Sequence, residues 1–233
     1  MRKGKLYLIP TIISEGTTDK LFSPLWKEDI RHLGHFCVEN VRTARRFLSS
    51  LKIFPSIEEL DFAILDKETD PENISELLKP ILSGNDVGVI SESGIPGVAD
   101  PGNLAVAYAH ANEIKVTVLP GPSSILLALA ASGLNGQQFA FHGYLPIDEK
   151  ECARTIKSLE NESKTKGQTQ IFIETPFRNN RLLKTMIKNL SPASILCLAL
   201  DITGSEERII CKKVSKWPKV DLPKLPAIFL FQG

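Results

Sequence analysis

The feature that most constrains the fold is a regular alternation of short apolar segments with amphipathic ones through the first half of the chain. Within residues 41–51, apolar side chains recur at helical spacing, at Ala44, Phe47 and Leu51. A β-α-β rhythm of this kind predicts a mostly parallel sheet with helices on its faces. Strands are predicted at residues 5–9, 35–39, 61–65, 87–91 and 115–119, and helices at 41–51, 71–83 and 103–112.

The second half has a different pattern, and the change occurs at Leu119-Pro120-Gly121-Pro122. A Pro-Gly-Pro sequence neither continues a strand nor sits inside a helix. A helix is predicted at 123–132, with Ser123 as its cap. Strands then follow at 139–143, 169–174, 195–200, 207–214 and 227–231, with long helices only at 149–163 and 177–190. The last two strands have no helix between them, which predicts that they pair antiparallel.

These patterns predict two domains. We expect an N-terminal α/β lobe over residues 1–118 and a C-terminal α+β lobe over residues 119–233, with a ligand site in the cleft between them.

The composition narrows the class of protein without identifying a partner. Lys and Arg total 28 against 27 Asp and Glu, so the net charge does not indicate a nucleic-acid partner. The four cysteines, Cys37, Cys152, Cys197 and Cys211, form no Cys-x-x-Cys pair, which argues against a disulfide framework or a zinc site. We therefore predict no metal, no membrane span and no signal peptide, and a cytoplasmic location.

The stretch with the strongest indication of chemistry is residues 89–102, where a buried strand leads directly into a loop. This loop holds three glycines, among them Gly94, and two prolines. Glycine lets a ligand approach the backbone closely, and proline holds the loop in one shape. A loop at the carboxyl end of a parallel strand is where an α/β sheet usually binds its ligand. A tight surface turn is the alternative, because the loop matches neither a Gly-x-Gly-x-x-Gly motif nor a P-loop.

Several blocks in sequence order extend the argument to almost the whole chain. They are Leu6-Tyr7-Leu8-Ile9-Pro10-Thr11, the loop at 91–102, Leu119-Pro120-Gly121-Pro122-Ser123-Ser124, the segment 132–146, Ile171-Phe172-Ile173-Glu174-Thr175-Pro176-Phe177-Arg178 and the closing Phe229-Leu230-Phe231-Gln232-Gly233. Together they resemble the tetrapyrrole methylase family. Within it, the chain is most similar to the bacterial methyltransferases that methylate the 2′-oxygen of a cytidine ribose in small-subunit ribosomal RNA.

The resemblance implies two α/β lobes, a mostly parallel N-terminal sheet and a mixed C-terminal sheet, with S-adenosylmethionine bound in the cleft. Residues of the first lobe and the junction implied to contact this cofactor are Pro10, Glu92, Ser93, Gly94, Ile95, Ser123 and Ser124. The C-terminal strands would supply an adenine and ribose wall from Ile173, Ala199, Leu200, Ala227 and Ile228. Apolar residues on strands fit an ordinary β-core equally well.

The chain departs from the resembled ribosomal RNA enzymes where substrate is expected. Their Glu-Asp-Thr-Arg segment reads Glu39-Asn40-Val41-Arg42 here, so the second acid is an amide, and an amide cannot act as a base. The segment after the third strand reads Asp66-Lys67-Glu68, and residues 12–16 replace a glycine-rich loop. We predict Glu39 and Arg42 as the catalytic pair. For Glu39, an interaction with the helix dipole is the alternative.

Three functions remain open from the sequence. The first is methylation of a ribose hydroxyl in ribosomal RNA, with the small ribosomal subunit as partner and a homodimer as the assembly. The second is methylation of a tetrapyrrole or another small molecule, because one fold serves both. The third is a cofactor-binding protein that has lost catalysis.

Overall fold

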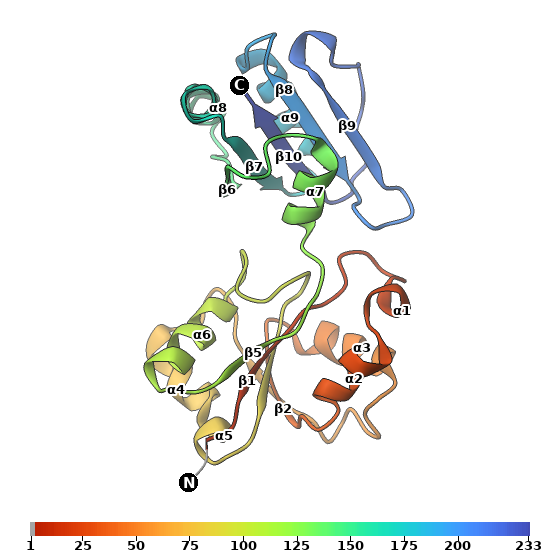
Figure 1. Ribbon diagram of the computed structural model, residues 1–233, viewed down its shortest axis with the longest axis vertical. Coiled ribbons are helices and arrows are strands. Elements are labelled where there is room, and N and C mark those ends of the chain that lie inside the picture. Colours follow the sequence, from red (N-terminus) through yellow and green to blue (C-terminus); the bar gives the residue numbers. More distant parts are fainter. Residues whose placement is uncertain (1–2) are drawn as a thin grey trace. The chain divides into compact units, whose positions relative to one another are not determined.

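The structure is a computed structural model that describes residues 3–233. The chain divides into two compact units, Met1–Ser123 and Ser124–Gly233, and each is described by itself below (Figure 1).

The first unit is built on a five-stranded sheet in which every pair of neighbouring strands is parallel. Its spatial order is β3-β2-β4-β1-β5, so the strand that comes first in the sequence lies between β4 and β5. The strands are β1 (Leu6–Ile9), β2 (His35–Val38), β3 (Asp61–Ile64), β4 (Val87–Ile90) and β5 (Val116–Val118). The central strands are continuously apolar because helices cover both faces of the sheet.

Helices pack on both faces of this sheet, as Figure 1 shows. One face carries α2 (Pro24–Ile30) and α3 (Val41–Leu51), with the short α1 (Thr18–Leu21) beside them. The other carries α4 (Ile74–Leu77), α5 (Lys79–Leu82) and α6 (Gly102–Ala111), preceded by the 3-10 turn η1 (Pro71–Asn73).

The prediction of a single helix over residues 71–83 is wrong. The segment is divided into η1, α4 and α5. Pro80 causes the interruption, because its nitrogen has no hydrogen to donate and its ring clashes with the preceding turn. Helix α2 was not predicted, although a local signal exists. Ser23 caps the helix by accepting a hydrogen bond from the Trp26 amide at 3.2 Å, and Pro24 occupies the first helical position.

The second unit holds a mixed sheet in the order β6-β7-β10-β8-β9. Its strands are β6 (Phe139–Tyr144), β7 (Thr169–Glu174), β8 (Ile195–Leu200), β9 (Arg208–Lys213) and β10 (Ala227–Gln232). Only β6 and β7 run parallel, and the other three pairs are antiparallel. The expected mixed C-terminal sheet is therefore confirmed, as is the parallel N-terminal one.

The predicted pairing of the last two strands with each other is wrong. Strand β10 lies between β7 and β8, whereas β9 pairs with the other edge of β8. The physical reason is composition. Strand β10 is apolar along almost its whole length and is buried, whereas β9 carries exposed Arg208, Lys212 and Lys213. Charged side chains of this kind suit the edge of a sheet.

The helices of the second unit lie on opposite faces of its sheet. Helices α8 (Glu149–Lys166) and α9 (Asn179–Asn189) bury one face in a core that includes Phe172, Phe229 and Phe231. Helix α7 (Ser124–Ser132) contacts β8, β9 and β10, and its buried side chains lie outside that core. A 3-10 turn, η2 (Val214–Lys216), follows β9. Among residues 3–233, no helix has both the length and the apolar character needed to cross a bilayer.

Candidate functional site

Three loops meet at the carboxyl edge of the first sheet, because β4, β1 and β5 are neighbours. The Thr11 amide, just after β1, donates to the Gly94 carbonyl at 2.9 Å, and the Thr11 hydroxyl donates to the Ser91 carbonyl at 3.0 Å. After β5, Gly121 packs so closely on Pro10 that a Cβ at this position would collide with the proline ring. The three sequence blocks that carry Pro10, Gly94 and Gly121 therefore form one cluster.

Gly94 lies at the centre of this cluster and is buried. Its φ angle is +76°, in the left-handed region where side chains are rarely tolerated. A Cβ built on Gly94 would lie 3.1 Å from the Pro122 carbonyl oxygen. Both the backbone conformation and the close approach of the third loop therefore require glycine.

Hydrogen bonds to its own backbone hold the loop at 91–102 in shape. The Ser93 amide donates to the Ser91 hydroxyl at 3.3 Å, and one carboxylate oxygen of Asp100 accepts from the Gly97 and Gly102 amides at 2.9 and 2.7 Å. The exposed Ser93 and the half-buried Ile95 lie on the loop that these hydrogen bonds hold in shape.

Glu39 follows directly after β2 and lies beside this loop, because β2 and β4 are paired. Its carboxylate accepts a hydrogen bond from the Glu92 amide at 3.3 Å and also contacts the carboxyl group of Asp100. Burial, together with the hydrogen bond and negative charge of Asp100, raises the pKa of Glu39 from 4.5 to about 7. A carboxylate with this proton affinity is suited to accept a proton near neutral pH.

Asn40 and Arg42 do not share this environment. The Asn40 side chain caps α3 by accepting hydrogen bonds from the Arg42 and Thr43 amides at 2.9 and 3.3 Å. Losing such a cap typically costs about 1 kcal/mol of stability. The Arg42 side chain is exposed and forms no ion pair with another described residue. The two residues predicted as the catalytic pair, Glu39 and Arg42, lie three positions apart in the sequence and form no ion pair with each other.

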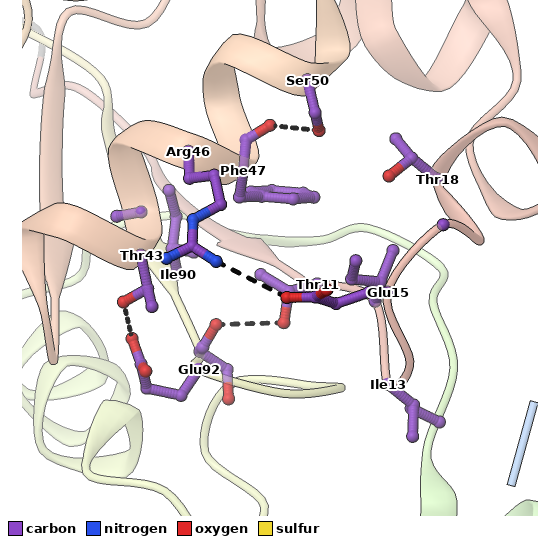
Figure 2. Close-up of a pocket in the computed structure, with 14 residues that line it drawn as sticks. Thr11, Ile13, Glu15, Thr18, Thr43, Arg46, Phe47, Ser50, Ile90 and Glu92 are labelled. Atoms are coloured by element: carbon purple, nitrogen blue, oxygen red, sulfur yellow. Dashed lines mark hydrogen bonds and ion pairs between the residues drawn. The ribbon is translucent and has the colours of Figure 1, made fainter. Parts of the chain in front are cut away.

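A cavity of about 480 Å³ opens beside α3, between the loop after β1 and the end of β4 (Figure 2). Its walls combine apolar side chains with hydroxyl groups and three charged side chains. The apolar wall includes Ile12, Ala44, Phe47 and Ile90, and the polar wall includes Thr11, Thr18, Thr43, Glu15, Arg46 and Glu92. Arg46 pairs with Glu15 at 3.5 Å, and the Thr43 hydroxyl donates to the Glu92 carboxylate.

Of the predicted site residues, Glu92 alone is among the residues that line this cavity. The helical spacing predicts Phe47 and Ala44 as core positions of an amphipathic helix, and nothing in that spacing indicates a cavity beside them. Asp100 was also missed. The one sequence signal for it was its place in the glycine- and proline-rich loop.

The segment after β3 forms a turn of its own. One Asp66 carboxylate oxygen accepts from the Glu68 amide at 3.0 Å and from the Thr69 hydroxyl at 3.1 Å. Lys67 and Glu68 are exposed and pair with each other at 3.8 Å. The structure thus gives Asp66 a local structural role.

In the second unit, the predicted wall residues fall on two faces of the sheet. Ile173, Ile228 and Ala199 form one row across β7, β10 and β8. Leu200 and Ala227 belong to the core on the opposite face, beneath α8 and α9. At the start of this unit, Ser124 is the first residue of α7, and Ser123 precedes it.

The chain is similar to known proteins over most of its length. The family model described as Tetrapyrrole (Corrin/Porphyrin) Methylases matches residues 36–216. A protein of Vibrio cholerae named ribosomal RNA small subunit methyltransferase I is 31% identical over 206 residues, which cover 88% of this chain and 67% of that protein. A protein with the same name from Buchnera aphidicola is 26% identical over 212 residues, covering 91% of this chain and 71% of that protein.

Solved structures show the same fold. The methyltransferase CobJ aligns with a TM-score of 0.62 at 18% identity and covers 97% of this chain and 93% of that one. A uroporphyrin-III-C-methyltransferase of Thermus thermophilus aligns with a TM-score of 0.54 at 16% identity, covering 100% and 93% of the two chains. The resemblance predicted from the sequence motifs is thereby confirmed, and the chain belongs to the tetrapyrrole (corrin/porphyrin) methylase family.

Proposed function

We propose that the protein is an S-adenosylmethionine-dependent methyltransferase that methylates a ribose 2′-hydroxyl of small-subunit ribosomal RNA. The names of the relatives from Vibrio cholerae and Buchnera aphidicola support the substrate class. The observation that carries the proposal is Glu39, a carboxyl group whose pKa is raised to about 7 beside the cavity-lining Glu92. A hydroxyl is a poor nucleophile unless a base removes its proton as it attacks.

The residues of the first unit fit such a cofactor. Gly94 leaves no side chain between the three converging loops, and the loop at 91–102 is already held in shape by its own hydrogen bonds. When bound, S-adenosylmethionine supplies a methyl group already activated by a sulfonium. The residues of the first unit proposed to hold it are Pro10, Glu92, Ser93, Gly94, Ile95 and Ser123.

The chain's own groups then orient the acceptor and take its proton. The cavity beside α3 is proposed to hold the acceptor, with an apolar wall for a ring and hydroxyl groups for hydrogen bonds. Glu39, which accepts a hydrogen bond from the amide of the cavity-lining Glu92, would accept the hydroxyl proton.

A methyl-transfer assay tests the function directly. The protein is incubated with tritiated S-adenosylmethionine and, in parallel, with unmethylated small ribosomal subunits or porphyrinoid precursors. Label in the ribosomal RNA, located at a ribose, is the expected result. Label only in the porphyrinoids would show that the small-molecule alternative is right. Cofactor binding without transfer to either would indicate lost catalysis.

Arg46 offers a matched test of the cavity, because its neighbour Arg45 lies elsewhere on α3. Arg46 lines the cavity, whereas the Arg45 guanidinium lies 5.3 Å from the centre of the Phe62 ring. We expect Arg46→Ala to raise the KM for the small subunit about 10-fold, on the order of 1.4 kcal/mol of lost acceptor binding, and to leave cofactor affinity unchanged. Arg45→Ala should leave this KM unaltered. Equal effects of the two variants would argue against an acceptor in the cavity.

A homodimer and a cytoplasmic location complete the proposal. The reduced state of all four cysteines is compatible with the cytoplasm. In analytical ultracentrifugation at micromolar concentration, we expect a species of twice the 25.7 kDa chain mass. A single monomeric species would contradict the dimer.

A further inference from the structure

Asp100 uses its two carboxylate oxygens for different purposes. Oδ1 accepts hydrogen bonds from the Gly97 amide at 2.9 Å and the Gly102 amide at 2.7 Å, which anchors the side chain to its own loop. Oδ2 is buried and receives no hydrogen bond from a donor in residues 3–233. A buried carboxylate oxygen without a donor is costly. Asp100 acts on the side chain of Glu39 through a hydrogen bond and through its charge.

A proton shared between the two acids satisfies this oxygen. If Glu39 is protonated, its hydroxyl donates to Asp100, and the Glu92 amide still donates to the other Glu39 oxygen. Oδ1 of Asp100 already accepts from two backbone amides, so Oδ2 is the oxygen left to accept a hydrogen bond from Glu39.

We propose that Asp100 is a positioning residue that orients Glu39 as the general base for methyl transfer to an oxygen. This inference rests on the proposed function. In the step, the acceptor oxygen bonds to the methyl carbon while the carbon–sulfur bond breaks and its electron pair stays on sulfur. The hydroxyl proton passes to the Glu39 carboxylate, where Asp100 accepts a hydrogen bond from it.

The surroundings of Glu39 favour this assignment. The charged groups that face it are Asp100 and Glu92, both acidic, and both raise its pKa. Glu92 is exposed, and its carboxylate accepts a hydrogen bond from the Thr43 hydroxyl on α3. Arg42, on the first turn of α3, is exposed to solvent and is not among the groups that shift Glu39. The Asp100 side chain acts on Glu39 through a hydrogen bond as well as through its charge, and it is anchored independently of Glu39.

Asp100→Asn separates this role from a structural one. The asparagine oxygen can still accept from Gly97 and Gly102, but its amide nitrogen would donate to Glu39 and the negative charge is lost. Both changes favour ionised Glu39. The pKa of Glu39, read by carbon-13 NMR of its side-chain carboxyl in the full-length protein, should fall from about 7 by at least one unit. The acid limb of the kcat–pH profile should move down by the same amount.

Asp70→Asn is the matched control. Asp70 also accepts a backbone hydrogen bond through one oxygen, from Glu72 at 3.0 Å, but it does not act on Glu39. This variant should leave the Glu39 titration and the pH profile in place. If Asp100→Asn lowers activity without moving either, Asp100 is only structural and the proposal is overturned. The proposal is also overturned if the measured pKa of Glu39 in the unmodified protein is near the ordinary value of 4.5.

The titration needs no acceptor, so it also distinguishes the two proposals. A Glu39 pKa that falls in Asp100→Asn, in a protein that methylates neither ribosomal RNA nor porphyrinoids, would support the pair and contradict the proposed function. Methylation of ribosomal RNA with an unmoved Glu39 titration would support the function and contradict the pair.

Discussion

Replacing Glu39 with glutamine is expected to lower the kcat of methyl transfer by about 10²-fold or more while cofactor affinity is unchanged. Glutamine keeps the shape of the side chain and can still accept a hydrogen bond from the Glu92 amide. It cannot take a proton from the acceptor hydroxyl. The loss should therefore appear in kcat and leave KM nearly unaltered, as for a group that acts in the transition state.

The wild-type pH profile gives a second signature of Glu39. Because only the ionised carboxylate can act as a base, kcat should rise with pH up to about 7 and then level off. Glu39→Asp retains the charge on a shorter side chain and should restore part of the activity. Near-full turnover by Glu39→Gln on the identified substrate would show that Glu39 only interacts with the start of α3.

The pH dependence of stability that Glu39 causes should be opposite to that of kcat, because stability should fall as the pH rises. Its folded-state pKa lies above the ordinary value, so folding favours the protonated form. The stability that this form contributes is present below pH 4.5 and is lost as the pH rises through about 7. Glutamine does not ionise. The thermal unfolding temperature of Glu39→Gln should therefore fall less between pH 4.5 and about 7 than that of the unmodified protein. A variant that loses activity yet gains relative stability at high pH is not simply misfolded.

Gly94→Val is expected to reduce the affinity for S-adenosylmethionine by about 10²-fold or more, on the order of 2.7 kcal/mol. Valine at φ +76° is strained, and its side chain would press against the Pro122 carbonyl, 3.1 Å from the Cβ position. The loops after β1, β4 and β5 could then no longer approach one another. Calorimetry with S-adenosylmethionine measures the effect.

Gly133→Val controls for backbone strain alone. Gly133 has a φ of +71°, but a Cβ there meets no atom within 4 Å. It should lose a similar amount of stability through strain and keep its cofactor affinity. If Gly94→Val folds and binds S-adenosylmethionine as tightly as the unmodified protein, the cofactor does not use this cluster.

The sequence by itself determined the local elements and the family. Helix α3 was predicted with the bounds that the structure shows, because its apolar period is regular. The structure adds that Asn40 caps it. Most strands were found within one residue at each end, since each is a short apolar run bounded by polar or turn residues. The helix predicted over residues 71–83 is divided in the structure, because Pro80 interrupts the backbone hydrogen bonding that the helical spacing predicts.

Long-range pairing was decided only by the tertiary structure. No local pattern states that β10 inserts between β7 and β8, because a strand's partners depend on which apolar surfaces are still uncovered. The same holds for the wall predicted on the second sheet. Ile173, Ala199 and Ile228 share one row, whereas Leu200 and Ala227 lie on the other face, because adjacent residues of a strand point to opposite sides.

At Glu39, too, the sequence predicts one part of the chemistry and the tertiary structure decides the rest. The sequence identified Glu39 as an acid at the end of a strand, where a parallel sheet presents ligand-binding groups. Asp100 lies 61 residues further along the chain and reaches Glu39 only because β2 pairs with β4. The pKa of Glu39 rises because burial and a second carboxyl group coincide there, and both are properties of packing between distant segments.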